Sequence, residues 1–224
     1  MLHSAIQREL RYLDYYLGIA PANEEGALAT NEASIDKYVE NSASLNCDLR
    51  RPCSWTNAPT DHLLDTSDFY LFKKTDTKSF PIQIRPGNAD PKPGELFMFA
   101  GNKTNDPQGA VLLSAPILCQ SSHGLLTFEY WLYNTARVEV LLVRVNADRG
   151  HLQVISRPPA DCHFLKSNSQ CRVEIPKQVE SFRIGIRAFA LRDANVGSFA
   201  MLNHIKYEAE VCGAYGECNI VKKY

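Results

Sequence analysis

From Leu45 onward the chain consists of short apolar or alternating segments separated by clusters of proline, glycine, asparagine and aspartate. Segments of this kind, bounded by turn-forming residues, are typical of strands in a sandwich or a barrel. No helical periodicity interrupts them, so the crossover helices that a parallel sheet needs are missing. The expected strands are Phe69–Lys73, Phe80–Arg85, Glu95–Ala100, Gly109–Leu113, Leu125–Tyr133, Arg137–Arg144, His151–Ser156, Cys171–Ile175, Ser181–Ala190 and Ser198–Glu210.

Alternation within the strongest segments predicts which side chains share a face. Leu126, Phe128 and Tyr130 point one way along their strand, while Thr127 and Glu129 point the other. Apolar rows of this kind form a core when two antiparallel sheets pack face to face. The sequence therefore predicts an all-β fold, an antiparallel jelly-roll-like β-sandwich.

A positively charged row accompanies one of these strands. Arg183 and Arg187 alternate with apolar residues, and Arg192 follows the strand. We expect this stripe to be solvated.

The N-terminal part of the chain has a different pattern. Between Ser4 and Leu17, apolar side chains recur at helical spacing and predict a short amphipathic helix, which could pack on the β domain or self-associate. Ile19–Ser44 has few large apolar groups and is interpreted as a flexible linker. The expected organisation is a helix and linker over 1–44, a β-sandwich over 45–213 and a tail over 214–224. The apolar positions of the predicted helix are Ile6, Leu10, Leu13 and Leu17.

The charge balance excludes several classes of partner. Lys and Arg number 24 against 25 Asp and Glu, a formal net charge of −1. The sequence therefore has no electrostatic footprint for nucleic acid. Its longest apolar runs, such as Val138–Val145, fall short of the roughly 20 residues of a membrane span, so no direct membrane insertion is expected.

Seven cysteines in 224 residues favour disulfides and an oxidising compartment. No Cys-x-x-Cys pair points to zinc or thiol redox chemistry. We therefore expect an extracellular or cell-surface associated chain. The first nine residues lack the apolar run of a secretory signal, so either a signal is encoded upstream or the chain stays inside the cell.

Four segments, in order, carry a resemblance to a known family. They are Cys47–Trp55 with its two cysteines and tryptophan, Ser114–Leu118, the strand of Leu126, Phe128 and Tyr130, and Gly197–Ile205. This succession resembles the MAM domain, an extracellular adhesion module, over Leu45 to Cys212. The opening loop departs from the family pattern, with Leu49 and Arg50 in place of phenylalanine and glutamate. The resemblance implies a concanavalin-like sandwich.

The disulfide pairing follows from loop length and the order of cysteines in that family. It implies Cys47 with Cys53, Cys162 with Cys171 and Cys119 with Cys212. Each closure is expected to contribute about 2 to 4 kcal/mol. Cys218 is then left as a free or intermolecular thiol.

No metal site or cofactor is expected. Some MAM domains hold a cation with carboxylates, and hard cations require several oxygen ligands. Arg50, Asn203 and His204 stand at the corresponding positions here, which predicts that such a site is lost.

The candidate catalytic groups show no motif spacing. Glu129 and Glu139, on neighbouring predicted strands, could form the carboxylate pair of a glycosidase, but solvent-facing charges explain them more simply. Cys162-His163 is interpreted as a disulfide beside an exposed histidine. Asn102 begins the sequon Asn102-Lys103-Thr104 and is a glycosylation candidate in a predicted loop.

Together these observations predict a non-catalytic extracellular binding module, secreted or membrane-associated. Its expected partner in cell adhesion or matrix interaction is an extracellular protein or matrix component, and homo-oligomerisation is left open. The alternative is a carbohydrate-binding or carbohydrate-cleaving concanavalin-like sandwich.

Overall fold

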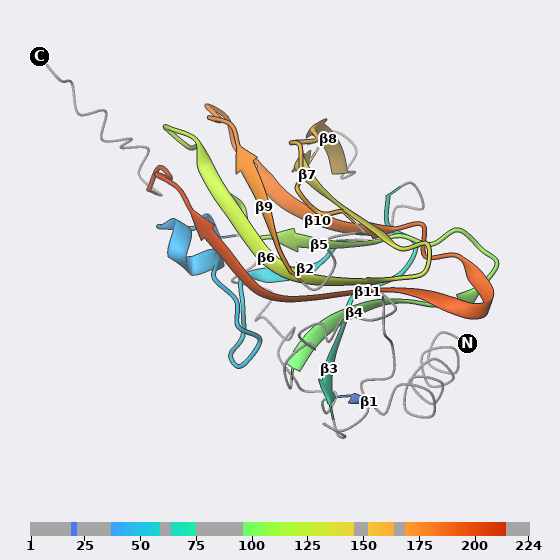
Figure 1. Ribbon diagram of the computed structural model, residues 1–224. Helices are drawn as coiled ribbons and strands as arrows, with labels where there is room; N and C mark the ends of the chain where they lie inside the picture. Colours follow the sequence, from blue (N-terminus) through green and yellow to red (C-terminus); the bar gives the residue numbers. More distant parts are fainter. Residues whose placement is uncertain are drawn as a thin grey trace, which may run out of the picture.

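Two antiparallel sheets dominate the structure (Figure 1). The computed structural model describes residues 19–21, 37–58, 64–74, 96–145, 152–163 and 169–213. Within these residues, one sheet has the strand order β1-β3-β4-β11-β6-β9 and the other the order β2-β5-β10-β7-β8. Every strand pair in both sheets is antiparallel. The predicted all-β sandwich is confirmed.

Most strand boundaries lie within two residues of the predicted segments, but one strand ends at Thr104 rather than Ala100 and another begins at Asp193 rather than Ser198. The six-stranded sheet contains β1 (Ile19–Pro21), β3 (Tyr70–Lys74), β4 (Leu96–Thr104), β11 (Asp193–Glu208), β6 (Gly124–Tyr133) and β9 (Ser169–Ile175). The five-stranded sheet contains β2 (Trp55–Asn57), β5 (Ala110–Ser114), β10 (Arg183–Phe189), β7 (Arg137–Val145) and β8 (Leu152–Ser156). A short 3-10 helix, η1, spans Ser42–Leu45. The expected strand Phe80–Arg85 and the expected N-terminal helix lie outside the described residues.

The main core lies between the two sheets and uses the predicted inward rows. On β6, the alternating residues Leu126, Phe128 and Tyr130 are fully buried. Ile184 and Ile186 on β10 belong to the same cluster from the opposite sheet. Burial of such rows is the main force that holds the layers together, at about 25 cal/mol per Å² of apolar surface.

The outer faces of both sheets are also partly apolar. On the five-stranded sheet, Val111 and Leu113 on β5 and Leu141 and Val143 on β7 form a second buried cluster with Ala58. The outer face of this sheet is therefore not a continuous solvated surface. This finding limits the expectation of a solvated arginine stripe, as described below.

Part of the expected linker is folded onto the sandwich. β1 pairs with β3 at the edge of the six-stranded sheet. Val39 is buried in the main core, and its N–H donates to the carbonyl of Pro116 at 3.0 Å. The Trp55 indole donates to the carbonyl of Leu45 at 2.8 Å. The described residues of the expected linker, 19–21 and 37–44, thus contact the sandwich through the strand pairing of β1 and the buried side chain of Val39.

Three disulfides lie within the described chain, two of which close short loops while the third joins distant segments. They are Cys47–Cys53, Cys119–Cys212 and Cys162–Cys171, the pairing that the family order implied. The Cys119–Cys212 bond links partners 93 residues apart. Cys218 and the tail over 214–224 lie outside the described residues.

Candidate functional site

A groove of about 520 Å³ opens where β7 ends and β10 begins. We call it the Tyr38 groove. Its floor is apolar and its rim is polar, the combination expected of a site that orients a ligand through a few hydrogen bonds. The groove is lined by Tyr38, Pro116, Val143, Arg144, Glu180, Ser181, Phe182 and Arg183.

Tyr38 reaches the groove because its neighbour is anchored. Val39 is buried and hydrogen-bonded to the backbone of Pro116, which also lines the groove. Tyr38 itself is 37% exposed. Among the described residues, only Tyr38 and Val179 are large hydrophobic side chains with this degree of exposure. The groove therefore offers an aromatic ring that a ligand can contact.

The rim carries a paired cation and carboxylate. Arg144 Nη1 lies 2.5 Å from Glu180 Oε2, and Arg144 Nε donates to the carbonyl of Ser181 at 3.2 Å. Arg183 Nη1 donates to the carbonyl of Ser114 at 3.3 Å. These bonds hold the planar groups in place before a ligand arrives. A planar guanidinium and a carboxylate held in this way can donate to and accept from neighbouring ligand hydroxyls.

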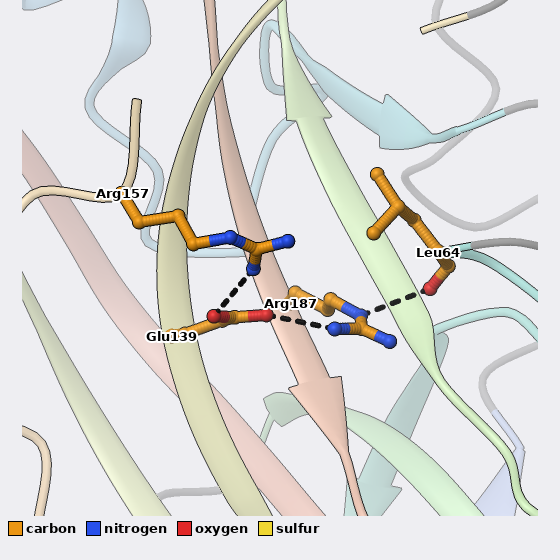
Figure 2. Close-up of polar contacts among 4 residues, drawn as sticks. All are labelled: Leu64, Glu139, Arg157 and Arg187. Carbon is orange, nitrogen blue, oxygen red and sulfur yellow. Dashed lines mark hydrogen bonds and ion pairs between the residues drawn. The ribbon is translucent and has the colours of Figure 1, made fainter. Parts of the chain in front are cut away.

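A second charged group lies further along the same sheet. Glu139 on β7 accepts from Arg187 of β10 at 2.8 Å and from Arg157 at 2.7 Å (Figure 2). Arg187 Nε also donates to the carbonyl of Leu64 at 3.0 Å, and its guanidinium lies 5.3 Å from the ring centroid of Phe189. This network ties together four segments of the domain, around Leu64, Glu139, Arg157 and Arg187.

The arginine stripe is therefore only partly solvated. The side chain of Arg187 is 20% exposed, because Glu139 and the backbone of Leu64 surround its guanidinium. Arg192 is exposed, as expected, and Arg183 lines the Tyr38 groove. We assign Arg187 to the scaffold and Arg183 to the candidate site.

The two glutamates considered as a glycosidase pair do not meet. Glu129 lies on β6 of the six-stranded sheet and Glu139 on β7 of the five-stranded sheet, each on the outer face of its layer. Glu129 Oε2 instead lies 2.8 Å from His204 Nδ1 in an exposed pair. The chain passes from one sheet to the other between β6 and β7, so strands adjacent in sequence belong to opposite layers.

Asn203 and His204, which stand where some MAM domains hold a cation, make other contacts. The side-chain oxygen of Asn203 accepts from the backbone N–H of His204 at 2.7 Å, and His204 contacts Glu129. In the described part of the chain, no group of three or more His, Cys, Asp or Glu side chains is placed to hold a metal ion.

A second groove, of about 580 Å³, lies beside the Cys162–Cys171 disulfide. His163 lines it and lies 3.5 Å from Asp161. Cys162 is disulfide-bonded, so it is neither a thiolate ligand nor a nucleophile. The described residues that line this groove include three prolines but no aromatic ring outside histidine, which makes it the weaker candidate.

The glycosylation candidate Asn102 lies in a strand rather than in the expected loop. It belongs to β4, where its partner in the register is Ser198 of β11. The glycine and asparagine that suggested a loop accompany a bulge, since the register shifts between Asp193 and Ser198. Modification of Asn102 stays a prediction.

The residues that sequence reasoning missed are Tyr38, Arg144 and Glu180. Tyr38 was assigned to a linker, although the pair Tyr38-Val39 stands out in a polar stretch. Arg144 and Glu180 lie on different segments and meet only through the pairing of β7 with β10. No local sequence motif predicts the contact between Arg144 and Glu180.

Comparisons with known proteins give distant structural neighbours only. No family model matches the chain, and no curated protein matches it. The MAM resemblance therefore stays a prediction. Among solved structures, the chain is similar to TmCBM61 in complex with β-1,4-galactotriose, with a TM-score of 0.38 and 10% identity over 70% of this chain and 88% of that one.

Two further neighbours are described as xylan-related modules. The CBM22-1 xylan-binding domain of Paenibacillus barcinonensis Xyn10C has a TM-score of 0.42 and 9% identity over 77% of this chain and 97% of that one. The Clostridium thermocellum xylanase 10B CBM22-1–GH10 modules, complexed with xylohexaose, have a TM-score of 0.39 and 9% identity over 76% of this chain and 28% of that one.

These descriptions correct the main functional expectation. The three neighbours reported above are described as carbohydrate-binding modules, whereas the main expectation was a cell-adhesion or protein-interaction module. The alternative, a carbohydrate-binding sandwich, agrees with them better. Similarity at this level transfers no ligand and no site, so the case for carbohydrate must come from the chain's own residues.

The compartment follows from the disulfides. Three disulfides within one small domain indicate an oxidising, extracellular environment. Separately, none of the helices in the described residues has the length and apolar character needed to cross a membrane.

Proposed function

We propose that this chain is a non-catalytic, extracellular carbohydrate-binding domain whose site is the Tyr38 groove. The observation that carries the proposal is an exposed tyrosine ring in the same groove as the Arg144–Glu180 pair, above an apolar floor.

The chemistry of a sugar ring matches this arrangement. A pyranose presents C–H groups on its faces, which pack against aromatic and apolar surface, and hydroxyls around its edge. Tyr38 supplies the exposed surface for the ring face, and the buried residues Pro116 and Val143 lie beneath it in the lining of the groove. Arg144 and Glu180 supply a donor and an acceptor for the hydroxyls.

The Arg144–Glu180 pair favours a ligand that presents hydroxyls rather than charge to it. Arg144 and Glu180 neutralise each other at 2.5 Å, so an incoming ligand does not have to neutralise the Arg144 charge.

Binding without cleavage is supported by the carboxylates. Glycoside hydrolysis commonly requires two carboxyl groups on either side of the scissile bond. Glu180 is the one carboxylate among the described residues that line the Tyr38 groove. Glu129 and Glu139 lie in opposite layers of the sandwich.

The test is a glycan array followed by calorimetric titration of the best oligosaccharide, with β-1,4-linked galactose and xylose oligomers included. We expect Tyr38→Ala to weaken binding about tenfold or more, because the lost ring contact corresponds to roughly 1.4 kcal/mol. Glu180→Gln, which keeps the shape but removes the charge, is expected to weaken binding as well.

Val179→Ala is the matched control. Val179 is 76% exposed and next to Glu180 in sequence, but it does not line the groove. Equal losses in Val179→Ala and Tyr38→Ala, or no glycan bound by the wild type, would contradict the proposed site. Shorter sugars released from the bound oligosaccharide would contradict its non-catalytic nature.

A further inference from the structure

A third groove, of about 500 Å³, is lined by both cysteines of one disulfide. Cys47 and Cys53 are six residues apart in sequence and close a small ring, which lies beside β11 where Cys47 bridges Ile205 (Figure 1). We call this site the ring groove. Its lining shares no residue with that of the Tyr38 groove, so a reaction here is independent of the proposed function.

The disulfide can be reached from the ring groove. Cys53 is partly exposed, whereas Cys47 is 5% exposed. On the core side, both cysteines line an apolar cavity together with buried residues that include Leu49, Trp55 and Met98. A polar reagent therefore approaches from the groove and meets the sulfur of Cys53 first.

The ring carries an excess of positive charge. Asp48, Arg50 and Arg51 stand between its two cysteines, and both arginines are exposed. Positive charge beside a sulfur atom favours the thiolate, which is the reactive form in disulfide chemistry. It also attracts a reagent that carries carboxylates.

The opposite wall of the groove adds two cations that are already paired. His204 Nδ1 lies 2.8 Å from Glu129 Oε2, and Lys206 Nζ lies 2.5 Å from Glu208 Oε1. Because these carboxylates offset the charge of that wall, the arginines of the ring decide the sign of the charge that an incoming reagent meets.

The ring also holds one residue in a strained backbone conformation. Leu49 has a φ of +63°, in the left-handed region that a residue with a Cβ atom rarely adopts, and its side chain is 6% exposed. Closure of so small a ring helps to keep Leu49 in this conformation. Opening the disulfide removes that constraint, which favours the open form.

The chain on either side of the ring is held without the disulfide. The backbone of Cys47 makes two hydrogen bonds with that of Ile205, at 2.8 and 3.0 Å. Just beyond the ring, the carbonyl of Ser54 accepts from the N–H of Ala115 at 2.8 Å. The domain should therefore keep its fold when the bond opens, so that opening can be reversed.

The other two described disulfides offer less to a reagent. Cys162 and Cys171 are 8% and 0% exposed. Cys119 is partly exposed, but its neighbours Leu118 and Gln120 carry no charge, and Cys119 lines neither the ring groove nor the two grooves described above. The Cys47–Cys53 bond is therefore the one that we expect to react first.

We propose that the Cys47–Cys53 disulfide is a site of thiol–disulfide exchange with a small thiol that carries carboxylates. The thiolate of the reagent attacks Cys53 Sγ and forms a mixed disulfide, while the bond to Cys47 breaks and Cys47 Sγ leaves as a thiolate that takes a proton from water. A second reagent thiolate attacks the reagent sulfur of the mixed disulfide and releases Cys53, which is protonated in the same way. Two electrons pass to the protein, and two reagent thiols become one reagent disulfide.

The test uses the full chain with Cys218→Ser, which removes the seventh cysteine, and reduced glutathione as the probe. Samples are quenched with acid at successive times, alkylated and mapped by mass spectrometry. We expect glutathione on Cys53 and a free thiol on Cys47 at least about tenfold sooner than any change at the other two disulfides. Circular dichroism should show that the sheets are retained.

Two charge variants separate attraction from simple access. Arg50→Gln with Arg51→Gln should slow the reaction with glutathione several-fold and should not slow the reaction with cysteamine, a thiol that carries an ammonium group. Lys177→Gln with Arg192→Gln is the matched control, because it removes two exposed cations that do not line the ring groove. It should react with glutathione as the parent chain does.

Three results would overturn the proposal. The first is glutathione attached first to a cysteine of another disulfide. The second is an equal effect of the two double charge variants on the rate with glutathione. The third is unfolding of the domain as soon as the Cys47–Cys53 bond opens. No glycan enters this assay, so its outcome is separate from that of the glycan-binding test.

Discussion

Glu139 and Arg187 lie directly opposite each other in the register of β7 and β10, and their side chains meet at 2.8 Å. Their exposures are 23% and 20%, so the pair is shielded from water more than most surface ion pairs. Arg157 adds a second contact to the same carboxylate. Glu139 is thus the central group that holds two guanidinium groups together on this face.

Removal of that carboxylate should be costly. We expect Glu139→Gln to lower the free energy of unfolding by about 1–3 kcal/mol, because the partly buried Arg187 loses its counter-charge and the exposed Arg157 loses its ion pair. Urea unfolding measures the change. Glu129→Gln is the control, since Glu129 and His204 are 42% and 57% exposed and such pairs contribute about 0–1 kcal/mol. Similar losses in the two variants would contradict a central role for Glu139.

The disulfides should differ in their contribution to stability. Loop-closure entropy grows with the length of the loop, so replacing Cys119 and Cys212 by serine should cost about 4–5 kcal/mol, and replacing Cys47 and Cys53 about 2 kcal/mol. Chemical unfolding of the two double variants tests the order. A larger loss for the short loop would show that native contacts, not chain entropy, decide the ranking.

Tyr207 should make stability sensitive to alkaline pH. Burial raises the pKa of its phenol above the ordinary value, and its hydroxyl donates to the buried side chain of Gln120. Because the folded state keeps the proton longer than the unfolded state, this stabilisation is complete below about pH 10 and is lost as pH rises further.

The variant Tyr207→Phe separates the hydrogen bond to Gln120 from the ionisation of the phenol. Tyr207→Phe should be less stable than wild type by about 1–2 kcal/mol at pH 8, where Gln120 loses its donor. The difference should narrow above pH 10, since phenylalanine does not ionise. Urea unfolding at both pH values measures it, and a constant difference would exclude a titrating Tyr207.

Gly101 should not accept a side chain. Its φ is +114°, and an added Cβ would lie 2.1 Å from the carbonyl oxygen of Ser198, a backbone atom of the paired strand. Gly101→Ala should therefore lower stability by at least about 2 kcal/mol. Gly213→Ala is the control, with no heavy atom within 4 Å of its added Cβ and an expected change within about 0.5 kcal/mol. Thermal melts that shift equally would contradict the steric argument.

The strands with strong alternation could be predicted from sequence because their pattern reflects the core directly. β6, β7 and β10 begin and end within two residues of the predicted segments. β1 and β2 were missed, since each is three residues long and is held by its partner strand rather than by its own pattern. The disulfide pairing could be anticipated only because a family order suggested it.

The candidate site could not be predicted, because its residues come together through long-range contacts. Tyr38 is placed by the bond between Val39 and Pro116, and Arg144 meets Glu180 only once β7 and β10 are paired. The predicted placement of Glu129 and Glu139 on neighbouring strands is wrong for a related reason. Proximity in sequence suggested neighbouring strands, but the chain changes sheets between them.

The bond between Cys119 and Cys212 also decides how the domain would respond to a mechanical pull. If the chain is pulled at a point beyond residue 213, the tension reaches Cys212 and passes through the disulfide to Cys119. The strands β6 to β11 lie between these cysteines in sequence and are left out of the force path. Stretching would therefore detach the strands that precede Cys119. The strands between the two cysteines, including the paired β7 and β10, would carry no tension and stay folded.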